Sequence, residues 1–129
     1  MSRAWAASEA GPVIAFLPEL DRRPAHVEVG GYLALQPGLH GFVEALYDCG
    51  LAQSFDWGAW AQTLEGSELV KGRGVASADL EAVRKALTAH VRVDRFMEGH
   101  LIVAIESGQV AALVRRLAEL AAVERSGLR

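Results

Sequence analysis

The sequence contains one cysteine, Cys49, two lysines and no apolar run long enough to cross a bilayer. A single cysteine excludes an intrachain disulfide and a zinc site built from several thiolates. Near the N-terminus, Glu9 and Gly11–Pro12 interrupt the stretch that would have to form the apolar part of a signal peptide. We therefore expect a cytoplasmic protein with no membrane association.

A basic excess is also missing, because 13 lysines and arginines face 16 acidic residues and give a net charge of −3. This balance does not favour nucleic acid or an anionic membrane as the partner. The chain of 129 residues is 51% hydrophobic and 22% charged, which is typical of a folded protein with a buried core. We expect one domain over residues 1–129.

Apolar residues recur at three- and four-residue spacing along most of the chain, and this periodicity predicts a mainly α fold of five to seven helices. Gly11–Pro12 interrupts the first helical segment, and Pro18 is expected to end it. Asp56 and Ser77 are the expected N-caps of later helices. The predicted helical segments are residues 3–17, 37–50, 56–65, 77–93 and 109–125.

Two segments depart from this helical pattern. Residues 26–35 read HVEVGGYLAL, with alternating valines before Gly30–Gly31, which predicts one short β-hairpin. Residues 100–107 contain five consecutive apolar residues and could form a buried strand or a short helix. Gly99 and Gly108 bracket this run as helix stops, and we therefore predict a short helix.

The segment RVDRFMEGH, residues 92–100, places a polar cluster between two core segments. If the helix beginning near Ser77 continues, Asp94 and Glu98 extend its apolar stripe toward the core. A buried carboxylate must be paired, and the nearby arginines or the backbone N–H groups of a restarting helix could pair with it. We predict that the cluster clamps a helix junction, and a functional site is the alternative; its members are Arg92, Asp94, Arg95, Glu98 and His100.

The same segment raises the question of a metal. His90, Asp94 and Glu98 follow one another at four-residue spacing, so one helical face could present all three. Imidazole and carboxylate are acceptable ligands of zinc or iron. No second acidic cluster completes a coordination shell, so we predict no metal and no cofactor.

Two ordered blocks resemble a known family. The segments FVEALYDCGLAQSFDWGAW, residues 42–60, and LTAHVRVDRFMEGHLIVAIESGQVAALVRRL, residues 87–117, are similar to the bacterial family of domain of unknown function 6508. The resemblance implies a small, mainly helical bacterial domain and implies no activity. The residues that match its polar and aromatic positions are Asp56, Trp57, Trp60, Arg92, Asp94, Arg95, Phe96 and Gly99.

Three functions stay open from the sequence. The first is a helical protein-interaction module, with a second copy of the chain or another protein as its partner. The second is nucleic-acid binding through residues 100–125, which have the helix, glycine turn and second helix of a helix-turn-helix. The third is a small enzyme or ligand-binding protein with its site near Asp94, lined by Trp57, Trp60 and Phe96. No catalytic motif supports this third function, and we expect that the protein is not an enzyme.

Overall fold

The computed structural model describes residues 5–22, 24–94, 97 and 99–127. These residues contain eight α-helices, three short 3₁₀ helices and one two-stranded antiparallel sheet, which confirms the mainly helical fold with one hairpin. The elements in chain order are η1 (Ala7–Ala10), α1 (Gly11–Ile14), α2 (Leu17–Asp21), β1 (His26–Val29), β2 (Tyr32–Leu35), η2 (Pro37–Leu39), α3 (His40–Asp48), α4 (Trp57–Ala61), α5 (Leu64–Val70), η3 (Val75–Ser77), α6 (Leu80–Val93), α7 (His100–Glu106) and α8 (Gln109–Ser126).

The helices outnumber the predicted five to seven because the N-terminal part and residues 57–70 are each divided into two short helices. Pro18 was expected to end a helix, but it lies in the first turn of α2. That position suits proline, since the N–H that it lacks would have no intrahelical partner there. Thr63 accepts a hydrogen bond from the N–H of Gly66 at 3.0 Å and so begins α5 separately from α4.

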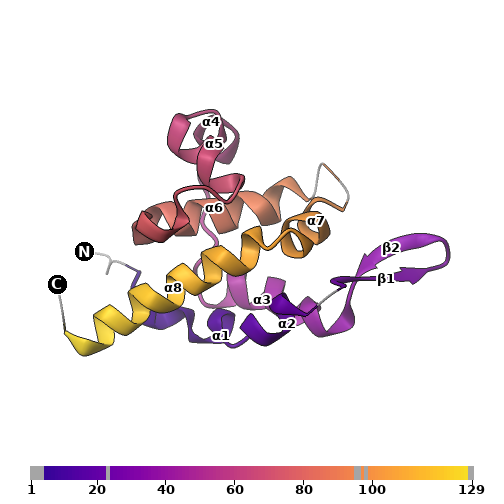
Figure 1. Ribbon diagram of the computed structural model, residues 1–129, viewed down its shortest axis with the longest axis horizontal. Coiled ribbons are helices and arrows are strands. Elements are labelled where there is room, and N and C mark those ends of the chain that lie inside the picture. Colours follow the sequence, from indigo (N-terminus) through magenta and orange to yellow (C-terminus); the bar gives the residue numbers. More distant parts are fainter. Residues whose placement is uncertain (1–4, 23, 95–96, 98, 128–129) are drawn as a thin grey trace.

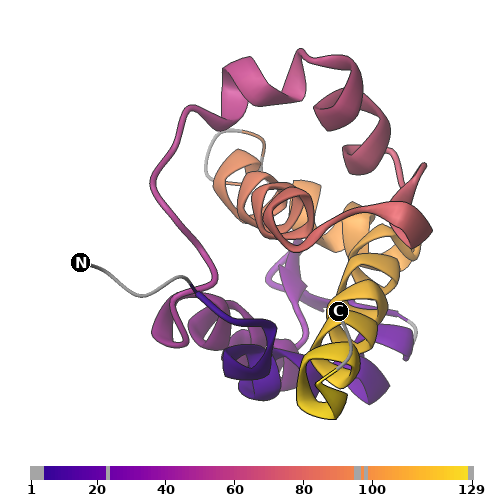
Figure 2. The ribbon, with the colours of Figure 1, turned by 90° about the vertical axis from the view of Figure 1, so that its left-hand side faces the viewer.

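Helix α6 lies at the centre of the molecule. Figure 2 looks nearly along this helix and shows the other helices arranged around it. The run from Ala86 to Val91 is buried without a break, because α4, α5, α7 and α8 all pack against α6. The N-cap is Asp79, which accepts from the N–H of Ala82 at 2.9 Å, whereas Ser77 had been predicted. Ser77 instead belongs to η3.

Helix α8 closes the core along its length. It packs against η1, α1, α2, α6 and α7, and its buried face includes Leu113 and Leu117. Near its C-terminal end, the carboxylate of Glu124 accepts hydrogen bonds from the N–H groups of Ala7 and Ser8 at 2.9 and 3.1 Å. Gly50, just after the end of α3, is left-handed, with φ +83°, a conformation typical of the glycine that follows a helix. None of the helices in the described part of the chain has the length and apolar character needed to cross a membrane.

The hairpin formed by β1 and β2 projects from the end of the molecule where α7 lies (Figure 1). Its register pairs His26 with Leu35 and Val29 with Tyr32. Gly30 and Gly31 form the turn with φ values of +58° and +86°, a backbone conformation that glycine adopts readily. Paired residues lie on the same face of a hairpin and neighbours alternate, so Leu33 and Tyr32 point to opposite faces.

Residues 100–106 form α7, as predicted, and not a strand. Gly99 and Gly108 flank it with φ values of +87° and +85° and separate it from α6 and α8. A helix of seven residues, about two turns, does not bury all of a five-residue apolar run, and Val103 remains 66% exposed while Leu101 and Ile105 are buried. This exposed valine lines a pocket that His26 and Leu33 of the hairpin also line.

Candidate functional site

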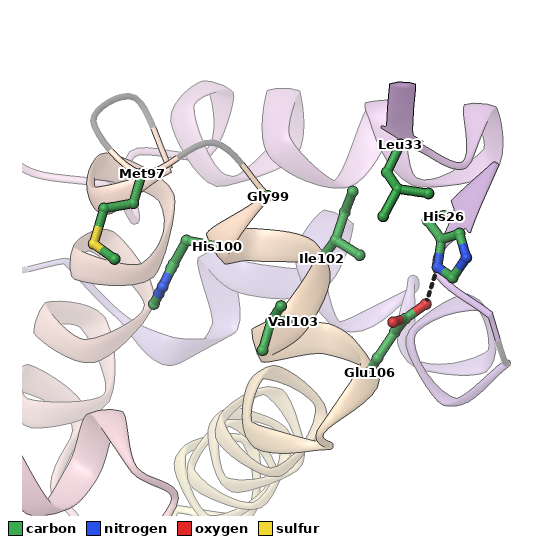
Figure 3. A pocket seen from close by; sticks show the side chains of 8 residues that line it. All are labelled: His26, Leu33, Met97, Gly99, His100, Ile102, Val103 and Glu106. Carbon is green, nitrogen blue, oxygen red and sulfur yellow. Dashed lines mark hydrogen bonds and ion pairs between the residues drawn. The ribbon is translucent and has the colours of Figure 1, made fainter. Parts of the chain in front are cut away.

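An open pocket of about 470 Å³ lies between the hairpin and α7. Figure 3 shows Leu33 and His26 of the hairpin at one end of this pocket and Met97 and His100 at the other. Its volume is within the range of sites that bind small molecules or protein side chains. The pocket is lined by His26, Leu33, Met97, Gly99, His100, Ile102, Val103 and Glu106.

The walls of the pocket are mainly apolar, and its polar groups lie at the two ends. At the hairpin end, Nδ1 of His26 and Oε2 of Glu106 are 2.5 Å apart (Figure 3). The same carboxylate oxygen accepts from the N–H of Ala25 at 2.9 Å. Glu106 therefore holds the base of the hairpin against the last turn of α7, and this bond becomes an ion pair when His26 is protonated.

At the other end, His100 is bonded to His90 of α6. Nδ1 of His90 and Nε2 of His100 are 3.0 Å apart, and the two rings stack with an interplanar angle of 22°. His90 is buried, and its Nε2 has no hydrogen-bond partner among the described residues. Burial, with a smaller contribution from the charge of His100, lowers the pKa of His90 to about 4. Burial also lowers the pKa of His100. Both imidazoles are therefore neutral at neutral pH.

Asp94 connects the end of α6 to the start of α7. Its Oδ1 accepts a hydrogen bond from the N–H of Leu101 at 2.9 Å, so this carboxylate caps a helix that Gly99 cannot cap with a side chain. Two kinds of partner were predicted for Asp94, the nearby arginines and the backbone N–H groups of a restarting helix. The structure shows the second kind, because Asp94 accepts from the N–H of Leu101. The expected pairing with Arg92 is not formed, because the guanidinium of Arg92 lies over the ring of Tyr47, 5.4 Å from its centroid.

The predicted cluster is brought together in part. Asp94 lies at the junction of α6 and α7, and His100 lines the pocket, whereas Arg92 points to Tyr47 of α3. Arg95, Phe96 and Glu98 lie outside the described residues.

Trp57 and Trp60 do not line this pocket. Trp60 is buried, meets Phe55 edge to face at 6.2 Å, and donates from Nε1 to Glu65 at 3.2 Å. Trp57 is partly buried against the core. Helix α4, which carries both tryptophans, packs on α5 and α6. The pocket that was predicted from Asp94, Trp57 and Trp60 together is therefore not the one between the hairpin and α7.

Sequence reasoning did not identify His26, Leu33 and Glu106 as site residues. They are separated by up to 80 positions in the chain, and only the packing of the hairpin on α7 brings them together. One available signal was the spacing of His100, Val103 and Glu106, which places all three on one face of a short helix.

The titratable side chains that line the pocket in the described part of the chain are His26, His100 and Glu106. Within the residues that the structure describes, no group of three or more His, Cys, Asp or Glu side chains could hold a metal ion. Cys49 belongs to the region after α3 and not to the pocket, and burial raises the pKa of its thiol, so it is not an activated nucleophile.

Most of the exposed apolar side chains lie at the end of the molecule that carries the hairpin and the pocket. Seven large hydrophobic residues of the described chain are exposed, and five of them lie on the hairpin, at residue 97 and on α7. We call these five the arm surface; their exposed fractions range from 59% to 73%, and they are Val29, Tyr32, Leu33, Met97 and Val103.

These features define a small helical domain with one buried central helix, an exposed hairpin and an apolar pocket beside it. The chain belongs to a family of unknown function (DUF6508), whose model matches residues 8–123. The predicted family is therefore confirmed. Comparison with curated proteins and with solved structures gave no match.

Proposed function

We propose that the chain is a protein-interaction module that binds a second copy of itself through the arm surface. The observation that carries this proposal is the concentration of five exposed apolar side chains at one end of the molecule. Leu33, Met97 and Val103 line the pocket, whereas Val29 and Tyr32 lie on the other face of the hairpin. Exposed apolar surface is typical of protein contact sites.

The size of the arm surface supports a partner of protein size. Five half-exposed side chains leave an apolar area on the order of several hundred Å², against roughly 800 Å² per partner in a standard interface. The apolar wall of the pocket and the flanks of the hairpin extend the area that a partner could cover. Polar atoms at the ends of the pocket would form the rim of such an interface.

A second copy is favoured over an unrelated protein because the arm surface contains both a projecting element and a recess. A surface with both features can pair with itself about a two-fold axis, which is the commonest symmetry of soluble oligomers. The hairpin has only two strands in the described chain, and two-stranded hairpins gain stability from packing on another element.

Light scattering after size exclusion tests this proposal. The wild-type protein is expected at about twice the monomer mass, and Val103→Asp is expected at the monomer mass, because a carboxylate on the arm surface would be desolvated by the partner. Leu64→Asp is the matched control, since Leu64 is 82% exposed on α5 and lies outside the arm surface. A wild-type monomer at all concentrations would contradict the proposal, as would a Val103→Asp variant that associates like the wild type.

Ligand binding is the second candidate, and the pocket favours it. An apolar recess of about 470 Å³ with histidines at both ends could hold a small apolar molecule with one polar group. Equilibrium dialysis of the protein with a mixture of such molecules, with Val103→Asp as the comparison, would test it.

The helix-turn-helix hypothesis has less support from the contacts of α8. Arg115 pairs with Asp21, and Arg116 donates to the carbonyl of Ala78 at 2.9 Å and to Glu119 at 3.2 Å. Arginines held by these groups are poorly placed to bind phosphates. We keep the cytoplasm as the proposed location on the basis of the single cysteine.

A further inference from the structure

We infer that the two copies exchange arms, so that Tyr32 of each copy fills the pocket between the hairpin and α7 of the other. This inference depends on the self-association proposed above and adds to it the residue that enters the pocket. Four features of the structure lead to it: the direction of Tyr32, the shape of the hairpin, the composition of the pocket and the position of both at the same end of the molecule.

Tyr32 cannot fill the pocket of its own chain. Leu33 lines that pocket, and its neighbour Tyr32 points to the opposite face of the hairpin because side chains alternate along a strand. Tyr32 is 73% exposed, the highest fraction within the arm surface. Tyr32 is also the largest side chain of the arm surface, so its burial on binding would remove more apolar area from water than burial of any other member.

The position of Tyr32 makes it accessible to a second molecule. It follows directly after the Gly30–Gly31 turn, and nothing lies within 4 Å of a Cβ built on either glycine. Figure 1 shows the hairpin extending beyond the helices, with its turn at the far end. A partner can therefore approach Tyr32 without contact with the helical body.

The pocket provides suitable surroundings for a tyrosine. Ile102 and Val103 form apolar walls, and Met97 offers a thioether, which packs favourably at the edge of aromatic rings. His100 and the His26–Glu106 pair lie at the two ends (Figure 3), where a phenolic O–H can form a hydrogen bond. A recess that is apolar in the middle and polar at its ends is suited to a side chain with an apolar ring and a polar tip.

Tyr32 and the pocket also occur together on one end of each copy. In the arrangement that we infer, a two-fold axis relates the two copies, so the two tyrosine–pocket contacts form together. Tyrosines in pockets are frequent centres of binding energy in protein interfaces. The exchange of an exposed hairpin requires no unfolding of the core around α6.

Disulfide trapping tests this arrangement. We would prepare Tyr32→Cys and Val103→Cys as two separate full-length proteins, each with Cys49→Ser, mix them and oxidise mildly. A disulfide requires Cα atoms roughly 4.4–6.8 Å apart, so an efficient mixed dimer would place position 32 of one copy at the pocket of the other. The matched control is Leu64→Cys in place of Val103→Cys, which should give no mixed dimer above the background.

Substitution of Tyr32 gives a second measurement. Tyr32→Ser is expected to raise the dimer dissociation constant by about 30-fold or more, whereas Tyr32→Phe should change it by less than about 10-fold, because the ring supplies most of the contact. Circular dichroism of both variants should match the wild type, since Tyr32 lies outside the core.

The outcomes separate this inference from the proposed function. If the wild type is dimeric and Val103→Asp is monomeric, but neither the mixed disulfide nor an effect of Tyr32→Ser is seen, arm exchange is overturned and self-association remains. A small apolar molecule that occupies the pocket without changing the dimer constant would also overturn arm exchange. A monomeric wild type would remove both.

Discussion

Nδ1 of His90 and Nε2 of His100 lie 3.0 Å apart and join the central helix α6 to the pocket-lining helix α7. One nitrogen must donate and the other accept, and this requires that at least one ring stays neutral. His90 is surrounded by the core, whereas His100 also reaches the pocket. The pair thus makes the core itself sensitive to acid.

Acid is expected to destabilise the fold through His90. Burial lowers its pKa from 6.5 to about 4, so the unfolded chain takes up the proton at a higher pH than the folded protein. The contribution of neutral His90 is therefore complete above about pH 6.5 and is lost as the pH falls toward about 4. The loss is on the order of 3 kcal/mol, because one pKa unit corresponds to 1.36 kcal/mol.

Urea unfolding followed between pH 7.5 and pH 4 measures this loss. His90→Leu should reduce the dependence within that window. His40→Leu is the control, since His40 is exposed and, within the described residues, bonds the carbonyl of Leu35. A direct check is an NMR titration of the imidazole protons of wild-type His90. A titration midpoint of His90 above pH 6 would contradict the prediction, because it would mean that burial in the core does not lower the pKa of this residue.

Loss of the Asp94 cap should weaken the start of α7. Asp94→Ala is expected to reduce the free energy of unfolding by about 1 kcal/mol, because the N–H of Leu101 then loses its acceptor. Asp94→Asn should retain most of the stability, since the amide oxygen can still accept. Chemical denaturation of the three proteins gives the comparison, and equal losses in both variants would mean that the charge matters more than the cap.

The base of the hairpin is expected to loosen when Glu106 is shortened. In Glu106→Ala the N–H of Ala25 and the ring of His26 both lose their shared acceptor, a cost of about 1–3 kcal/mol. Hydrogen exchange should then rise in β1 and β2 while α6 stays protected. Glu28→Ala, an exposed position on the same hairpin, serves as the reference and should leave the exchange rates unchanged.

Substitution by alanine is expected to have different effects on stability at Gly66 of α5 and at Gly58 of α4. A Cβ on Gly66 would lie 2.1 Å from the carbonyl oxygen of Trp60, so Gly66→Ala must shift backbone and should cost about 1–3 kcal/mol. A Cβ on Gly58 meets Oδ1 of Asp56 at 3.7 Å, an ordinary contact. Gly58→Ala should therefore be neutral or stabilise α4 by up to about 1 kcal/mol. Thermal unfolding of both variants tests this contrast, and a Gly66→Ala protein as stable as the wild type would contradict it.

Local patterns in the sequence predicted the local parts of this structure. The spacing of Leu80, Val83 and Leu87 indicated α6, and Gly30–Gly31 indicated the hairpin turn. One of the two predicted N-caps is correct, because Asp56 caps α4. The other is wrong, since the N-cap of α6 is Asp79 and not Ser77. Both residues can cap a helix, and the choice depends on where the preceding η3 ends.

The pocket could not be predicted in the same way. Its polar contact between His26 and Glu106 joins positions 80 residues apart. The spacing of apolar residues in the sequence does not predict how a hairpin is oriented relative to the helices. The tryptophans and Asp94 were grouped by residue type, but α4 packs on α5 and α6, whereas Asp94 bonds the N–H of Leu101 at the junction of α6 and α7. Residue type predicted which side chains are polar or aromatic, whereas only packing determined which of them are neighbours.

The hydrogen bonds that Glu124 accepts from the N–H groups of Ala7 and Ser8 decide where labels can be attached to the chain. They hold both ends of the described chain on the side away from the hairpin (Figure 1). Fluorescent proteins fused to either end would leave the arms uncovered. In the proposed pair, two such labels would sit at opposite poles of an elongated particle, and energy transfer between them would be weak even when every chain is bound.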